Sequence, residues 1–242
     1  MIEVMKNIKD IKSYFSTRNN GVSQTPFESL NVGFHVGDDD INVLENHKYI
    51  KSFFNENSKI SYMNQIHSNK VCNIGELNEI AQCDALITDK KDKILMVMVA
   101  DCIPILFFDK KKKVIAAIHA GRAGAFKNII GQTLSLMKKR YKSSIEDLVV
   151  SIGPHIQHCC YEVGREIVDE AIALDLECFI KEKNKSFHLD LLSLVLYQLH
   201  NIGVDRENIE IVNECTACNT DKYFSYRKEG KTGRFCGVIM LE

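Results

Sequence analysis

The chain has 242 residues, of which 45% are hydrophobic and 26% are charged, and its formal net charge is −1. This composition is that of an ordinary globular protein with a sizeable core. A formal net charge of −1 predicts no overall basic field, so we expect no nucleic-acid partner. No apolar stretch reaches the roughly 18 residues of a membrane-spanning helix, and the first residues do not resemble a signal peptide. We therefore expect no membrane partner and a cytoplasmic location.

Nine cysteines are spread along the chain. An odd number in a chain expected to be cytoplasmic argues against a disulfide framework. Most of these cysteines should therefore be small buried hydrophobic residues, and one or two could take part in chemistry. No repeat, low-complexity segment or linker divides the sequence, so we expect one domain over residues 1–242.

Strand patterns dominate the first half of the chain. An early alternating segment is interrupted by Ser68 and Asn69 and then resumes. Two later apolar runs flank a polar turn that contains Lys110–Lys113, which predicts a β-hairpin. This lysine run is more typical of a solvated turn than of a binding patch. The predicted strands cover residues 61–67, 71–74, 84–88, 94–99, 103–108 and 114–118.

Helices and strands are interspersed in the second half. After the small-residue turn Gly121–Gly124, apolar residues recur at helical spacing from Phe126 to Tyr141, which predicts a helix. Asp190 is placed to cap a later helix. Clustered strands with helices between them indicate an α+β fold rather than a regular βαβ repeat. The other predicted elements are a helix over 164–174 and strands over 148–152, 209–212 and 235–241.

The hairpin brings a cysteine and a histidine together. If its turn is centred on Lys111, Cys102 faces Ala120, next to His119. Opposed Cα atoms in such a ladder lie about 4.5–5.5 Å apart. A thiol and an imidazole at the open end of a rigid hairpin can hold a metal or form a nucleophile with its base. Either residue alone is more typical of a core position, so the inference rests on their joint placement beside Asp101.

His67, at the end of a predicted strand, adds a third candidate ligand. Three protein ligands with a free fourth position are the pattern of catalytic zinc, whereas structural zinc sites close with four. Two histidines and one cysteine also suit copper. A multicopper oxidase needs many histidines, and the eight in this chain include no His-x-His pair, which favours zinc. From the residues alone, a metal site and a metal-free pair of Cys102 and His119 both remain open.

Several arginines are candidate ligands for an anion. The turn Gly121–Gly124 joins a strand to a helix, where free N–H groups favour an anion and Arg122 would add charge. A tight turn with a solvated arginine is the alternative. Arg227 and Arg234 could bind a phosphate or carboxylate bidentately, or be ordinary surface residues. The candidate substrate-binding residues are Arg18, Asn31, Arg122, Arg227 and Arg234.

A second cysteine pattern offers a rival metal site. Cys215 and Cys218 form a CxxC motif, which supplies half of a structural zinc site. A thioredoxin-like context for a redox role is missing. Cys159 and Cys160 could supply the other two ligands, which gives a four-cysteine alternative that we consider weaker than the His–Cys–His set.

The motifs, taken in their order along the chain, resemble those of the YfiH or laccase-domain family. The match runs through most of the chain. The central signatures are Ala100–Pro104 and His119–Gly121. There is one departure, because the family usually continues with Trp-Arg-Gly where this chain has Arg122-Ala123-Gly124. The other matching segments are 15–18, 29–33, 35–39, 64–67, 83–88, 152–154, 159–164, 215–216 and 224–227.

The resemblance implies a layered α/β sandwich of mixed sheets with flanking helices, and zinc ligands that fall on His67, Cys102 and His119. It implies a purine nucleoside phosphorylase that acts on adenosine, inosine and S-methyl-5′-thioadenosine, with adenosine deaminase activity. It accounts for Cys215 and for Cys159–Cys160 as family sequence, without a second metal.

Other functions stay open beside this one. An older family label is polyphenol oxidase, with copper in place of zinc, and bacterial members are linked to peptidoglycan editing. A metal-free cysteine hydrolase and a non-enzymatic metal-binding or cell-wall module are the remaining alternatives. We expect Cys102, His119 and Asp101 to be catalytic, purine nucleosides and phosphate to be the small-molecule partners, and the assembly to be a monomer or homodimer.

Overall fold

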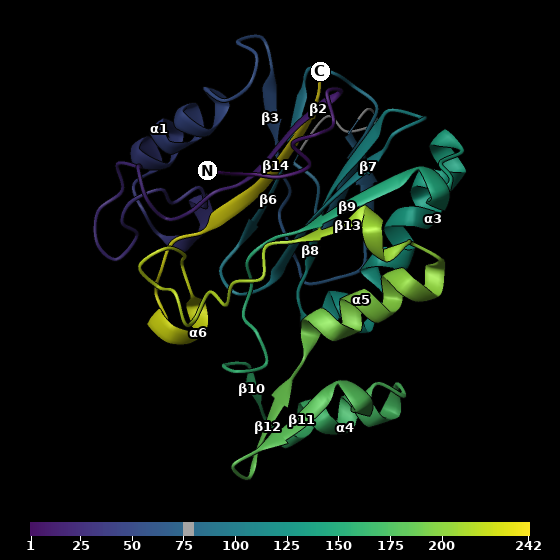
Figure 1. Cartoon of the computed structure of the whole chain (residues 1–242). Coiled ribbons are helices and arrows are strands. Elements are labelled where there is room, and N and C mark those ends of the chain that lie inside the picture. The colour runs from purple at the N-terminus through teal and green to yellow at the C-terminus, as the bar shows by residue number, and fades with distance from the viewer. Residues whose placement is uncertain (75–79) are drawn as a thin grey trace.

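The structure is a computed structural model that describes residues 1–74 and 80–242. Two large sheets pack face to face and form the body of the molecule (Figure 1). The five-stranded sheet contains, in spatial order, β1 (Ile2–Glu3), β2 (Ile11–Phe15), β14 (Phe235–Leu241), β6 (Lys93–Val99) and β3 (Lys59–Ser61). The six-stranded sheet contains β13 (Ile209–Ile211), β9 (Leu148–Ile152), β7 (Ile103–Asp109), β8 (Val114–Ala120), β5 (Ala85–Thr88) and β4 (Val71–Asn73).

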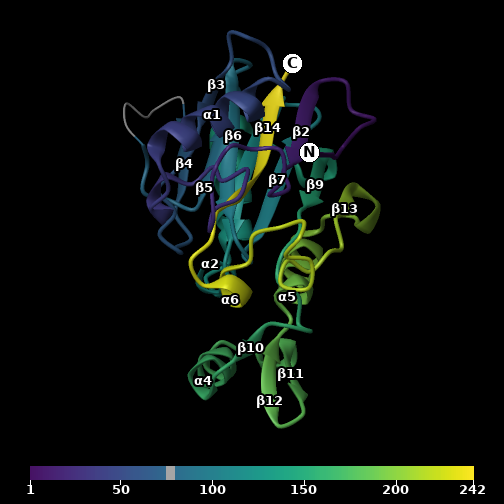
Figure 2. The ribbon, with the colours of Figure 1, turned by 90° about the vertical axis from the view of Figure 1, so that its left-hand side faces the viewer.

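A third, small sheet lies apart from the body. It consists of β10 (Glu162–Val163), β12 (Ser186–Leu189) and β11 (Ile180–Lys183). Together with helix α4 (Arg165–Ala173) it forms an appendage below the two large sheets (Figure 2). The other helices are α1 (Asp40–Lys51), α2 (Arg122–Phe126), α3 (Ile129–Tyr141), α5 (Leu191–Ile202) and α6 (Tyr226–Glu229).

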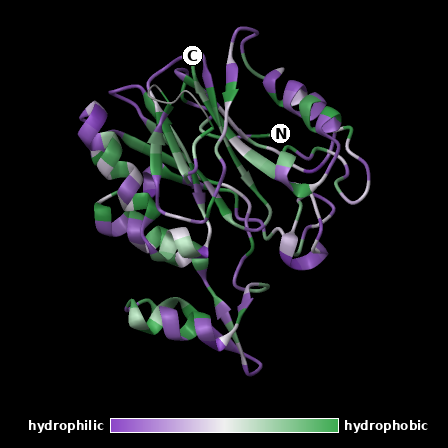
Figure 3. Ribbon diagram, turned by 180° about the vertical axis from the view of Figure 1, so that it is seen from behind, coloured by the Kyte–Doolittle hydropathy of each residue, from purple (hydrophilic) through white to green (hydrophobic). Residues whose placement is uncertain are grey.

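Alternation along the strands creates the layers. In β7, Leu106 and Phe108 are buried between the two large sheets, whereas Ile105 and Phe107 belong to the core under α3 and α5. Successive side chains on a strand point to opposite faces, so each central strand contributes to two cores. Helix α1 covers the outer face of the five-stranded sheet, where Ile50 packs near β6 and β14. Figure 3 shows hydrophobic colour concentrated on the strands of the body, with both colours on the helices.

The layers therefore run helix, sheet, sheet, helix. Both large sheets are mixed, because β3 pairs with β6, β4 with β5 and β13 with β9 in parallel, while the other pairs are antiparallel. This is the predicted layered sandwich of mixed sheets with flanking helices. In the part of the chain that the structure describes, no helix is long and apolar enough to cross a membrane.

The predicted hairpin is present, but its register is shifted by one residue. Ile103 pairs with Ala120 and Asp109 with Val114, so the turn is the four-residue segment Lys110–Lys113. Asp109 fixes this turn: one carboxylate oxygen accepts the N–H groups of Lys111 and Lys112, at 2.9 and 2.8 Å. The prediction that Cys102 faces Ala120 is therefore wrong, and the same register extended by one step places Cys102 beside Gly121.

Two other predicted elements end early or divide. The strand predicted over 61–67 stops at Ser61, and beyond it the side-chain amide of Gln65 bonds the main chain of Met98, at 2.9 Å to its N–H and 2.7 Å to its carbonyl. The helix predicted from Phe126 is two helices, because Asn128 adopts a left-handed conformation and caps α3. The other predicted strands and helices occur within one or two residues of their predicted limits, and Asp190 caps α5.

Candidate metal centre and cavity

Three side chains from separate segments meet at the open end of the hairpin. Cys102 directly precedes β7, His119 is the penultimate residue of β8, and His67 lies in the loop between β3 and β4. One ligand atom from each lies within 4.8 Å of the others. The two imidazole rings are perpendicular, with centroids 4.8 Å apart. The structure thus brings the three predicted ligands together.

Gly121 makes this close approach possible. A Cβ atom at residue 121 would lie 3.0 Å from Cys102 Sγ and 3.2 Å from His67 Cδ2. These distances are shorter than ordinary contacts, so a side chain there would push the cysteine and histidine apart. One thiolate, two imidazoles and space for a further ligand are the donor set of a catalytic zinc site. The residues present therefore fit zinc.

A buried carboxylate, which the sequence analysis did not assign to the site, holds two of the three ligands. Asp84 directly precedes β5 and is fully buried. Its Oδ1 accepts the N–H of His67 at 3.0 Å and lies 2.8 Å from His119 Nδ1. Its Oδ2 accepts the N–H and the hydroxyl of Ser68, at 2.6 and 2.7 Å. Because Ala85 pairs with Ile118 across the β5–β8 ladder, the residue before β5 stands opposite His119, and this register could have identified Asp84.

The carboxylate also decides the tautomer of His119. An ionised carboxylate only accepts hydrogen bonds, so His119 Nδ1 carries the proton and Nε2 is left for a metal or for Cys102. Burial acts to lower the pKa of His119, but the Cys102 thiolate and the Asp84 carboxylate outweigh it and raise the pKa to about 9. Burial acts to raise the pKa of Cys102, but His119 and His67 outweigh it and lower the pKa to about 6. Without metal, the pair is therefore a thiolate and an imidazolium at neutral pH.

A second buried carboxylate, that of Asp101, connects the site to late segments of the chain. Asp101 Oδ1 accepts the hydroxyls of Thr216 and Ser225, at 2.6 and 2.7 Å, and Oδ2 accepts the N–H of Arg227 at 2.6 Å. Its main chain has a φ of 93°, a conformation that is costly for any residue except glycine. The three hydrogen bonds of the side chain stabilise this conformation. Asp101, predicted as catalytic, thus has a clear role in positioning the late segments of the chain.

The metal ligands open onto a cavity of about 660 Å³. This volume is typical of a small-molecule site. Burial and the charge of Arg234 lower the pKa of His35, which therefore lines the cavity as a neutral imidazole. Sequence reasoning gave no role to several of the lining residues, namely His35, Asn64, Gln65, Tyr161 and Tyr226.

The five predicted substrate-binding residues do not share one place. Arg227 and Arg234 line the cavity. The other three are not among the described residues that line it. Arg18 is bound by the Glu229 carboxylate at 2.7 Å and by two main-chain carbonyls. Asn31 is buried, and its Oδ1 accepts the main-chain N–H of Arg234 at 2.8 Å. Asn31 therefore holds the main chain of that arginine in place.

The chain is similar to several known proteins. The family profile described as multi-copper polyphenol oxidoreductase laccase matches residues 12–242. A purine nucleoside phosphorylase of Clostridium acetobutylicum is 36% identical over 94% of this chain and 90% of its own length. The purine nucleoside phosphorylase YlmD of Bacillus subtilis is 31% identical, over 98% and 91%. The chain belongs to the YfiH laccase-domain family.

Solved structures of YfiH-family proteins share the fold. A Neisseria meningitidis protein of the DUF152 family superposes with a TM-score of 0.87 at 31% identity, over 97% of this chain and 95% of the other. The YfiH protein of Bacillus licheniformis superposes with a TM-score of 0.90 at 28% identity, over 96% and 93%. The layered sandwich is therefore the fold of the family.

Arg122, where the chain departs from the YfiH pattern, contacts two other side chains. The guanidinium of Arg122 forms an ion pair with Glu170 of α4 and lies over the ring of Phe126, 5.5 Å from its centroid. The arginine thereby links α2 to the appendage.

Replacing the carboxylate beneath the ligands tests its role in metal binding. We expect Asp84→Asn to weaken zinc affinity by roughly 10- to 100-fold, because His119 loses the acceptor that fixes its orientation. Competition with a chromophoric chelator measures this affinity. Asp92→Asn, at an exposed carboxylate, is the matched control and should leave the affinity unchanged. Equal affinity in Asp84→Asn and the unaltered protein would show that the carboxylate does not support the ligands.

The low pKa of the Cys102 thiol predicts that this cysteine is alkylated at a lower pH than an ordinary cysteine. In metal-stripped protein, the thiolate fraction rises with pH, so the iodoacetamide rate at Cys102 should be half-maximal near pH 6. An ordinary cysteine reaches this point near pH 8.5. Peptide mass spectrometry across a pH series measures the midpoint. His119→Ala should shift the midpoint upward, and a midpoint near 8.5 in the unaltered protein would contradict the assignment.

Proposed function

We propose that this YfiH-family chain is a zinc-dependent purine nucleoside phosphorylase that acts on adenosine, inosine and S-methyl-5′-thioadenosine, with adenosine deaminase activity. The observation that carries the proposal is the presence of the His–Cys–His set and two arginines in one cavity. The names of the relatives from Clostridium acetobutylicum and Bacillus subtilis support it.

The metal side of the cavity would supply Lewis-acid chemistry. His67, Cys102 and His119 would hold zinc, which polarises a bound oxygen and lowers the pKa of bound water to about 7. Asp84 keeps the proton on His119 Nδ1 and so leaves Nε2 as a ligand atom. These residues favour a reaction with water at a purine carbon, which is what deamination of adenosine requires.

Phosphorolysis needs an anion site near the sugar. A phosphate oxygen attacks C1′, the bond from C1′ to the purine nitrogen breaks, and the proton of the hydrogen phosphate passes to the leaving purine. Arg227 donates to the carbonyl of Glu162 at 2.6 Å, and its guanidinium lies over the ring of Tyr161, 5.1 Å from its centroid. Arg234 donates to two main-chain carbonyls at 2.9 and 3.0 Å. Each guanidinium has five N–H donors, so both arginines are held in place and keep donors for phosphate.

The leaving purine needs a stacking surface and a polar partner. Tyr161 and Tyr226 line the same cavity as the arginines and offer aromatic faces for a planar base. His35 is neutral, so one of its ring nitrogens carries a hydrogen and can donate a hydrogen bond to a purine nitrogen. We assign these roles by the chemistry of the lining side chains.

One observation favours a second candidate, the metal-free cysteine hydrolase. In space, the carboxylate of Asp84 contacts the imidazole of His119, which in turn lies beside the thiolate of Cys102. This is the arrangement of a nucleophile, its base and an orienting group. Chelation separates the two candidates, because a hydrolase of this kind keeps its activity without metal.

The test is incubation of the zinc-loaded protein with inosine and phosphate. We expect hypoxanthine and ribose 1-phosphate in equal amounts, no product without phosphate, and loss of the reaction after chelation. Adenosine should give inosine as well as adenine. If the zinc-loaded protein forms neither hypoxanthine nor ribose 1-phosphate from inosine and phosphate, the proposed phosphorylase activity is wrong. Stoichiometric copper in natively purified protein would favour the oxidase that the family description names.

Arg234 allows a sharper test of the phosphate site. We expect Arg234→Gln to raise the KM for phosphate by roughly 10-fold or more, because a charge-assisted hydrogen bond contributes about 1.5–3 kcal/mol. Initial rates at varied phosphate concentration measure the effect. Arg165→Gln is the matched control, since Arg165 is exposed and pairs with Asp169 on α4. An unchanged KM for phosphate in Arg234→Gln would remove this arginine from the anion site.

A further inference from the structure

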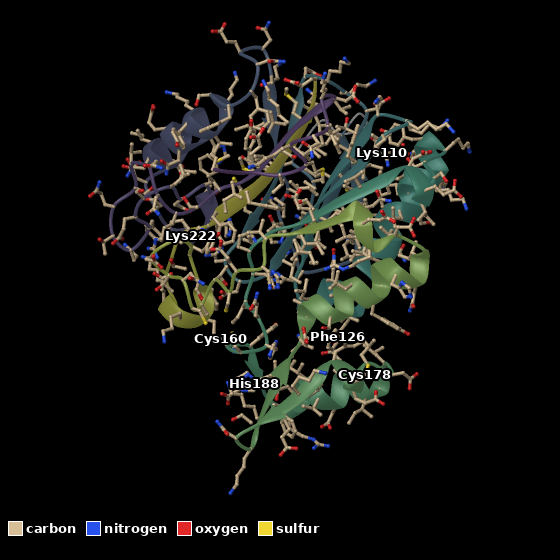
Figure 4. All side chains as sticks on the ribbon, viewed as in Figure 1. Lys110, Phe126, Cys160, Cys178, His188 and Lys222 are labelled. Atoms are coloured by element: carbon tan, nitrogen blue, oxygen red, sulfur yellow. The ribbon has the colours of Figure 1, made fainter. Side chains whose placement is uncertain are left out.

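Four cysteines gather at one point outside the His–Cys–His set. Cys159 and Cys160 lie in the loop between β9 and β10, and Cys215 and Cys218 lie in the loop between β13 and α6. Their four Sγ atoms all lie within 4.8 Å of one another. Figure 4 shows Cys160 at the junction between the body and the appendage. Two distant segments therefore bring together a complete set of four thiols.

The printed separations between the sulfur atoms are closer to those around a single tetrahedral ion than to that of a disulfide. With zinc–sulfur bonds of about 2.3 Å, two ligand sulfurs in a tetrahedron lie about 3.8 Å apart. Cys159 Sγ lies 3.7 Å from Cys160 Sγ and 3.8 Å from Cys218 Sγ, and Cys160 and Cys218 are 3.3 Å apart. A disulfide would need a separation of about 2.05 Å. A cluster of several irons would hold its thiolates farther apart than a single ion does.

The main chain around the four cysteines holds the two loops in register. His155 and Cys215 form an isolated parallel bridge, in which the N–H of Thr216 donates to the His155 carbonyl at 3.0 Å. The N–H of Gln157 points at Cys215 Sγ, at 3.5 Å. An N–H directed at a sulfur favours the thiolate form, which is the form that binds metal. The site is therefore held in place by bonds other than those to a metal.

From this geometry we infer a second metal site, in which Cys159, Cys160, Cys215 and Cys218 bind one zinc ion as four thiolates. Four protein ligands leave no free position, so the site is structural rather than catalytic. The ion would fix two neighbours of the cavity. Tyr161, which follows Cys160, lines the cavity, and Thr216, which follows Cys215, donates to Asp101 at 2.6 Å. The second site would thus stabilise part of the cavity wall.

Metal analysis tests this site without reference to any reaction. After reconstitution with zinc and gel filtration, we expect two zinc ions per chain in the unaltered protein. The double variant Cys160→Ser/Cys218→Ser should hold one, and Cys102→Ser should also hold one, from the other site. Cys178→Ser is the matched control, because Cys178 is an exposed cysteine outside both groups, and it should keep two. If Cys160→Ser/Cys218→Ser holds as much zinc as the unaltered protein, the proposal fails.

A second measurement uses the unaltered chain and does not depend on how the variants fold. With zinc bound, the peptides that carry the four cysteines should be protected from N-ethylmaleimide, and a chelator should expose them. Cobalt(II) in place of zinc should give the strong thiolate-to-metal absorption of a four-sulfur site. Equal labelling with and without zinc, or a disulfide among the four under reducing conditions, would overturn the site. These results stand apart from the phosphorylase assay, so either proposal can fail alone.

Discussion

The buried carboxylate of Asp84 is the constraint on which the candidate metal centre depends. It accepts four hydrogen bonds, from the main chain of His67, from both donors of Ser68 and from the ring of His119. A carboxylate taken out of water is costly unless each oxygen is hydrogen-bonded, so this group is stable only where these donors converge. The loop that carries His67 and the strand that carries His119 are therefore fixed relative to each other before any metal binds.

Asp101 makes the corresponding connection to the late segments of the chain. Its two oxygens collect donors from Thr216, Ser225 and Arg227, which come from segments more than a hundred positions away in the sequence. Both carboxylates lie just before strands of the six-stranded sheet. Asp101 comes before Cys102, which precedes β7, and Asp84 comes directly before β5. Two of the three candidate ligands thus lie in the central hairpin or directly before it, and the two acidic residues connect the His67 loop and the late segments of the chain to it.

Periodicity was enough to predict most strands, the α+β class and the proximity of Cys102 and His119, because alternation and helical spacing are local properties. Periodicity missed the hairpin register because alternation does not show how many residues form a turn. The carboxylate of Asp109 accepts the N–H groups of Lys111 and Lys112, which gives a four-residue turn and moves the pairing by one residue. The motifs identified the set of His67, Cys102 and His119. They did not separate Arg227 and Arg234 from Arg18, because whether an arginine faces a cavity or a glutamate depends on tertiary packing.

The two halves of the cavity need different kinds of support. In one half, His119 belongs to β8 and Cys102 directly precedes β7, so β-ladders hold this part of the cavity. The half that carries Tyr161 and Arg227 comes from loops and the four-residue helix α6, which gain little from secondary structure. Ordering such segments costs about 1–2 kcal/mol of backbone entropy per residue, so they require cross-links. Asp101 provides one and the bridge between His155 and Cys215 another. A tetrahedral ion on the four neighbouring thiols would complete this support at the point where the two loops come closest.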